Sequence, residues 1–178
     1  MKHLVFGVIM SIVAVAAAAH TDSPYVGQET RDIKALSPQD IEDYLHGRGL
    51  GYAKAAELNH YPGPRHVLDL AHTLALTPEQ TRQTRAIFET MQAQAVALGK
   101  QLVEKEQALD RQFANGSIDA VSLQALVSEI GGLQAKIRYT HLVAHLEQKA
   151  LLTEHQVQLY DQLRGYRAAH GQGHRHAH

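Results

Sequence analysis

The 178-residue sequence has no cysteine and no tryptophan, and aromatic residues make up only 6% of it. Without cysteine the chain can form no disulfide, no thiolate metal site and no cysteine nucleophile. Lysine and arginine number 17 against 18 aspartate and glutamate residues, which gives a net charge of −1. This balance lacks the positive excess of nucleic-acid-binding proteins, so we expect no nucleic-acid partner.

Proline is also scarce, and all five prolines lie at or before Pro78. The residues after Pro78 are therefore free to form long helices. Apolar residues recur at helical spacing from Phe88 to Phe113 and again from Leu126 to Leu151, with a break at Asn115–Gly116. The sequence predicts an all-α fold, an elongated antiparallel hairpin of two long helices with short flanking helices. Two such helices cannot bury both apolar faces alone, so we expect a homodimer.

The first 19 residues have the pattern of a secretory signal peptide. Lys2 and His3 are basic, Leu4 to Val15 is apolar, and Ala16 to Ala19 offers an A-x-A cleavage site. Cleavage before His20, together with the absence of disulfides, predicts a periplasmic protein. The alternative is an uncleaved membrane anchor over residues 4–19, which is shorter than the roughly 20 residues that span a bilayer.

Turn-forming residues concentrate in the first part of the mature chain. Gly47, Gly49 and Gly51 alternate, but no strand precedes them and their spacing is not that of a dinucleotide-binding loop, so we reject a phosphate-binding role. Composition divides the chain into a signal peptide (1–19), a flexible lead (20–36), a short helix capped by Ser37 with a Gly/Pro-rich connector (37–64), a helical hairpin domain (65–169) and a disordered His-rich tail (170–178).

The stretch LTPEQ at residues 76–80 has a near copy, LTEHQ, at residues 152–156. In each copy the threonine can accept a hydrogen bond from the third helical N–H, and the glutamine can bond back to the cap, which is a capping box. Each copy therefore predicts a helix start. We expect a brief helix over residues 67–74 before the first copy, and a final helix that reaches about Ala169 after the second. The motif residues are Leu76, Thr77, Gln80, Leu152, Thr153 and Gln156.

In combining a signal peptide, a cysteine-free helical hairpin and two LTxxQ motifs, the chain resembles the periplasmic LTxxQ superfamily. That group includes the Spy/CpxP chaperone-like proteins, the zinc-resistance-associated ZraP proteins and the CnrX-type heavy-metal sensor domains. The resemblance spans about Val67 to Tyr166. It implies an exported helical protein that acts by binding. The residues themselves contain no recognisable catalytic set, so we do not expect an enzyme.

Histidine is the abundant residue, with 13 copies. His141 and His145 stand four apart on a predicted helix, so both imidazoles project from one face as a two-ligand metal clamp. Folding the hairpin about Asn115–Gly116 brings Glu89 level with this pair, and His72 can join if the preceding segment folds across the open end. The tail adds weaker ligands at His170, His174, His176 and His178.

The metal site of the CnrX-type sensors implies a ligand set of His72, Glu89 and His145 in this chain. The sensors also carry a further histidine and a methionine, where this sequence has Leu68 and Lys149. His66 and His141 are the candidate substitutes; without them the site is weaker or empty. The alternative is that Glu89 and His145, which fall beside the apolar seam of the hairpin, are solvated surface residues.

The ligand types also predict which ions the site takes. Nitrogen and oxygen ligands favour Zn²⁺, Ni²⁺, Co²⁺ or Cu²⁺, and the single mature methionine, Met91, argues against a soft Cu(I) site. Because metal competes with protons for histidine, such a site should fail below about pH 6.

Three functions are compatible with the sequence. The first is a metal-responsive stress protein, either a heavy-metal sensor or resistance protein or a zinc-linked chaperone. The second is a metal-independent chaperone of the Spy/CpxP kind that holds unfolded client proteins. The third is an inhibitory or anchoring partner of a membrane signalling protein such as an envelope-stress sensor kinase.

Overall fold

A computed structural model describes residues 23–166 of the chain. The predicted signal peptide (1–19) and the predicted tail (170–178) lie outside these residues. All regular structure in the described part is helical, which confirms the predicted all-α class. No helix in this part has both the length and the apolar character that crossing a bilayer requires. The helices are α1 (Pro38–Leu45), α2 (Lys54–Glu57), α3 (Pro64–Asp69), α4 (Pro78–Ala114), α5 (Ala120–Leu151) and α6 (Glu154–Leu163).

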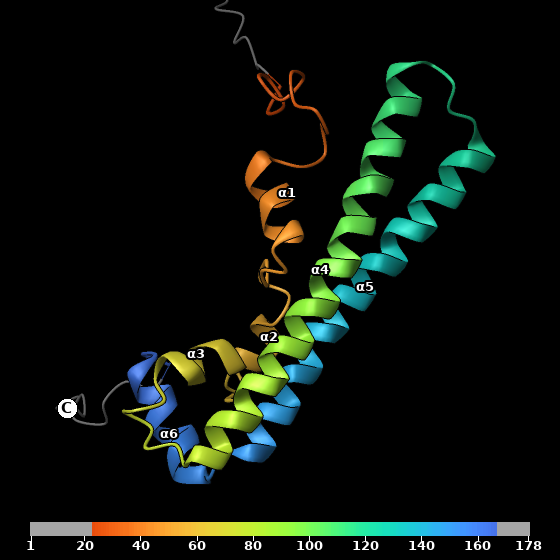
Figure 1. Cartoon of the computed structure of the whole chain (residues 1–178). Coiled ribbons are helices and arrows are strands. Elements are labelled where there is room, and N and C mark those ends of the chain that lie inside the picture. The colour runs from red at the N-terminus through yellow and green to blue at the C-terminus, as the bar shows by residue number, and fades with distance from the viewer. Residues whose placement is uncertain (1–22, 167–178) are drawn as a thin grey trace, which may run out of the picture.

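The two long helices form the spine of the molecule. Helix α4 has 37 residues, and α5, with 32, returns beside it in the opposite direction (Figure 1). The reversal is made at Gly116, whose φ of 63° is in the left-handed region that glycine adopts without strain. Asp119 then caps α5 by accepting a hydrogen bond from the Ser122 N–H at 2.7 Å.

The spine is not packed along its whole length. The axes of α4 and α5 move apart toward the turn (Figure 1), and Phe113 is 56% exposed. The apolar stripe of α4 extends to Phe113, but at this end of the spine α5 is no longer close enough to cover it. Val121 and Val127 near the start of α5 are exposed as well.

Two short helices differ in extent from the prediction. Helix α3 begins at Pro64, not at residue 67, because Gly63 serves as its N-cap and proline fits the first helical position. It ends at Asp69. Helix α6 ends at Leu163 and does not reach Ala169, because Gly165 takes a φ of 74° and closes the helix in a left-handed turn.

The two LTxxQ motifs are in direct contact. Both capping boxes are formed, around Thr77 and Thr153. Gln80 Nε2 donates to Gln156 Oε1 at 2.9 Å, and Gln156 Nε2 donates to Gln80 Oε1 at 3.1 Å. Gln156 also donates to the carbonyl of Leu74 at 3.2 Å. The repeated motif therefore starts two helices and joins their first turns through a reciprocal pair of amides.

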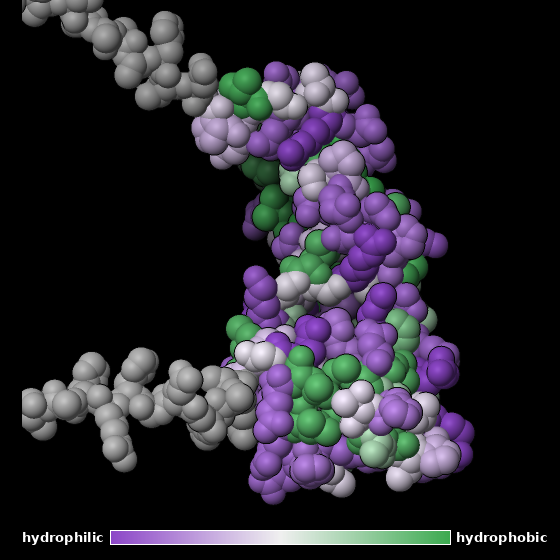
Figure 2. Space-filling view, turned by 90° about the vertical axis from the view of Figure 1, so that its left-hand side faces the viewer, coloured by the Kyte–Doolittle hydropathy of each residue, from purple (hydrophilic) through white to green (hydrophobic). Residues whose placement is uncertain are grey.

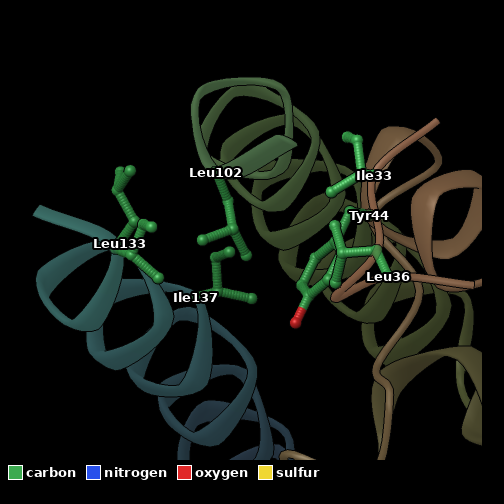
Figure 3. Packing of buried hydrophobic residues seen from close by; sticks show 7 residues of the cluster. Ile33, Leu36, Tyr44, Leu102, Leu133 and Ile137 are labelled. Carbon is green, nitrogen blue, oxygen red and sulfur yellow. The ribbon is translucent and has the colours of Figure 1, made fainter. Parts of the chain in front are cut away.

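A hydrophobic cluster ties the N-terminal segment to the spine. Tyr44 of α1 packs with Leu102 of α4 and Ile137 of α5 (Figure 3). Ile33 and Leu36 belong to the same cluster and are 3% and 9% exposed. The prediction of a flexible lead over residues 20–36 is therefore wrong for its last residues, because their apolar side chains are buried here.

A second cluster closes the other end of the spine. Val67, Leu74, Leu152, Val157 and Tyr160 pack together between α3 and α6. Seen from the side of α1 and α3, hydrophilic side chains cover most of the surface, and hydrophobic ones gather toward the end where α3 and α6 lie (Figure 2). Between these two clusters, the segment that links α1 to α3 lies across the spine.

Candidate metal and ligand site

A cavity of about 300 Å³ lies where the segment between α1 and α3 crosses the spine. The loop of residues 46–51 forms one wall, residues 63–66 form another, and α4 and α5 supply the base. His141 and His145 of α5 both line it. The Gly/Pro-rich stretch expected to be a connector is therefore the wall of a site.

His145 is held in one orientation. Its Nδ1 lies 2.7 Å from the carbonyl oxygen of Tyr61 and 3.6 Å from Glu57 Oε2, and the residue is 7% exposed. A carbonyl accepts only, so Nδ1 carries the proton and, in the neutral ring, Nε2 keeps its lone pair. This tautomer, fixed by a carbonyl on the other nitrogen, is the one that metal-binding histidines commonly have. The Lys149 ammonium holds Tyr61 in turn, 3.7 Å from the ring centroid.

His141 is buried without a complete set of partners. It is 4% exposed, and its Nε2 has no hydrogen-bond partner among residues 23–166. Burial lowers the pKa of His141 to about 4, with a further contribution from the neighbouring His145. The ring is therefore neutral at pH 7. An unsatisfied buried polar group costs free energy, so its retention calls for a ligand or another explanation.

Glu57 of α2 joins this region to α6. Its Oε1 accepts hydrogen bonds from the hydroxyls of Tyr160 and Tyr166, the latter at 3.0 Å, and lies 3.6 Å from Arg164 Nε. Burial, and next the hydrogen bond to Glu57, raise the pKa of Tyr160. The tyrosine therefore stays protonated and donates. Glu57 in this way fixes the wall of the cavity against the end of the spine.

The structure separates the residues of the predicted metal site. His145, His141 and His66 line the cavity, whereas His72 and Glu89 are exposed and do not. Thr84 of α4 accepts a hydrogen bond from Gln148 of α5, a register that sets Glu89 level with Val143 close to the clamp. The position of Glu89 along the axis of α4 thus agrees with the expectation that it lies level with the His141–His145 pair. Its side chain points to solvent, because one residue turns a helix by about 100° and the neighbouring position, Phe88, faces the cavity.

Sequence reasoning missed several residues of this site. His46 lines the cavity, and its Nδ1 lies 2.8 Å from the carbonyl of Glu42, so it has the same fixed tautomer as His145. Glu57 and Tyr61 were likewise assigned only to the connector. A usable signal was the density of glycine, proline and histidine between residues 46 and 66, which a simple spacer does not need.

The cavity is not a complete metal site as it stands. Within residues 23–166 no group of three or more His, Cys, Asp or Glu side chains is close enough together to hold an ion. His141 and His145 both line the cavity, so an ion bound there would need at least one further ligand from the cavity wall. Comparison with protein-family models, curated proteins and solved structures finds no match for this chain.

Proposed function

We propose that this is an exported, metal-responsive stress protein that acts by binding, with its metal site at the His141–His145 pair. The carrying observation is the buried Nε2 of His141, which has no hydrogen-bond partner in the described residues and belongs to a side chain that lines the same cavity as His145. Neutral imidazoles suit Zn²⁺, Ni²⁺, Co²⁺ and Cu²⁺. The signal-peptide pattern of residues 1–19 supports export to the periplasm.

The need to recruit a third ligand would make such a site responsive. His46 and His66 are the candidates for this third ligand. His46 follows α1. His66 lies in α3, and its Nδ1 is 3.6 Å from the exposed Asp69. Drawing either side chain toward α5 would pull the segment between α1 and α3 onto the spine. A metal would then stiffen the contact between that segment and the long helices, and a partner protein could recognise the change.

Calorimetric titration with Zn²⁺ and Ni²⁺ tests the proposal. The protein should carry glutamine in place of the four tail histidines, so that the tail contributes no binding. One stoichiometric site is expected, with affinity at least tenfold weaker in His141→Leu and unchanged in His72→Ala. Equal affinity in the parent protein and both variants would refute the assignment.

A metal-independent holding chaperone is the second candidate, and one observation favours it. Phe113, Val121 and Val127 expose apolar surface where α4 and α5 spread apart, and Leu123 is 36% exposed beside them. Exposed apolar patches bind unfolded clients or a second copy of the chain. If this function is right, the protein suppresses aggregation of an unfolded client equally well with and without EDTA. Val121→Ser/Val127→Ser should lose that suppression. Light scattering for the mass of the particle would show whether the same surface forms the expected homodimer.

A further inference from the structure

The cavity around the histidine pair has a positive lining. Arg48, Lys54, Arg65 and Arg164 contribute to its walls, and Glu57 is the sole carboxylate among the described residues that line it. At about 300 Å³ the cavity is at the small end of the range for ligand sites, which fits a compact molecule rather than a large cofactor.

Glu57 alone cannot balance those four positive charges. Its two oxygens already face the hydroxyls of Tyr160 and Tyr166, Arg164 and His145. Three of these contacts fall on Oε1, and they include the ion pair with Arg164, so the single negative charge of Glu57 is already shared.

Two of the four cations have matching carboxylates and two do not. Arg48 is paired with Asp43 at 2.7 Å and with Glu42 at 3.1 Å, and Arg164 shares Glu57. Within residues 23–166, neither Lys54 nor Arg65 has a carboxylate at ion-pair distance. The end of the Lys54 side chain lies close over Gly51, in the wall of the cavity.

A metal on His141 and His145 would add two further positive charges to this lining. Even after His46 or His66 is recruited as a third ligand, at least one position stays open on a four-coordinate ion. An anion from solution would both offset the positive charge and fill an open coordination position, because it can coordinate the metal with one oxygen and face a lysine or arginine with another.

We propose that the cavity is a site for a small dicarboxylate-type anion, held by Lys54 and Arg65 and, when metal is bound, coordinated to the ion on His141 and His145. The metal arm of this inference rests on the proposed function, whereas the anion arm rests on the lining alone. Metal and anion would then bind cooperatively, each strengthening the other by the same factor.

Co²⁺ titrations with and without malonate test the inference on the full chain with glutamine at the four tail histidine positions. After correction for Co²⁺ complexed by free malonate, Co²⁺ should bind at least tenfold more tightly in saturating malonate. The visible spectrum of the bound Co²⁺ should also change as an oxygen ligand enters. Lys54→Gln/Arg65→Gln should bind Co²⁺ no more weakly than the parent without malonate, because it removes two positive charges from the lining, and it should lose the enhancement. Equal affinity with and without malonate, or an enhancement that survives in the double variant, would overturn the ternary site.

A metal-free titration separates this inference from the proposed function. If Co²⁺ fails to bind, or binds equally well to His141→Leu, the metal assignment falls while the anion site remains testable. Malonate titrated into EDTA-treated protein should then still bind, and bind at least fivefold more weakly to Lys54→Gln/Arg65→Gln. Arg85→Gln/Lys100→Gln, at two exposed positions of α4 outside the cavity lining, also removes two positive charges and is the matched control. No difference between the double variant and this control would refute the anion site.

Discussion

The contact between α1 and α4 should be intolerant of a single added methyl group. Gly99 of α4 is buried beneath the last turn of α1, and a Cβ built on it would lie 2.2 Å from the Tyr44 carbonyl oxygen and 2.8 Å from its carbon. Ordinary contacts of a Cβ atom begin at 3.4 Å, so α1 would have to retreat by about 1.2 Å (3.4 minus 2.2). The obstacle is backbone, which cannot swing aside as a side chain can.

Gly99→Ala should therefore destabilise the protein although alanine is the better helix former. Overpacking of this kind costs typically about 1–3 kcal/mol, and the gain in helix propensity returns about 1 kcal/mol. Retreat of α1 would also loosen Tyr44, which is buried against Leu102 and whose hydroxyl lies 3.0 Å from that of Tyr52. A mid-range overpacking cost of about 2 kcal/mol less the gain in helix propensity leaves an expected net loss in the free energy of unfolding of about 1 kcal/mol.

Gly131→Ala is the matched control, because Gly131 lies inside α5 with nothing within 4 Å of its added Cβ. That change should stabilise the protein by about 1 kcal/mol. Urea unfolding followed by circular dichroism at pH 7.5 with EDTA measures both, and amide exchange should be faster in α1 of Gly99→Ala only. If Gly99→Ala proves as stable as Gly131→Ala, the backbone contact between α1 and α4 is refuted.

Three further predictions concern the polar contacts. Gln80→Ala and Gln156→Ala should each lower the free energy of unfolding by about 1 kcal/mol. A double-mutant cycle should give a coupling energy of at least about 0.5 kcal/mol, and additive losses would exclude the reciprocal amide pair. Glu57→Gln should cost about 1–3 kcal/mol in urea unfolding, since it removes the charge that accepts two tyrosine hydroxyls; an unchanged midpoint would contradict this. The lowered pKa of His141, about 4 against 6.5, means that the unfolded chain binds this proton more readily, so stability is full above pH 6.5 and falls as the pH drops toward 4. Between pH 7 and pH 5 the loss should be about 2 kcal/mol; His141→Leu with EDTA should remove it and the exposed His72→Gln should not, and an identical pH dependence in all three proteins would refute the buried neutral ring.

Local features of the fold could be read from the sequence. Thr77 and Thr153 begin α4 and α6 where the capping boxes predicted, Ser37 begins α1, and Gly116 ends the first long helix. Each of these depends on hydrogen bonds or backbone angles within a few residues of the chain. Both partners of such an interaction lie close together in the sequence, so its formation does not depend on what packs around it.

Contacts between distant segments could not be read in the same way. Gln80 and Gln156, which bond each other, are far apart in sequence. Ile33 is buried in a cluster with residues of α4 and α5, and the cavity wall near His46 faces residues of the same two helices. Folding the hairpin about Asn115–Gly116 gave the level of Glu89 on α4. The sequence left open whether its side chain joins a metal site or faces solvent, and the structure shows it exposed.

The sequence by itself therefore determined the two long helices, the capped starts of α1, α4 and α6, and the histidine pair of α5. Only the tertiary structure decided which histidines are buried together, because that depends on the path of residues 46–66 across the spine. Gly99 permits the close approach of α1, and Glu57 anchors α2 to α6. Those two contacts place the loop over His141 and His145, and they act through space between segments that no local pattern links.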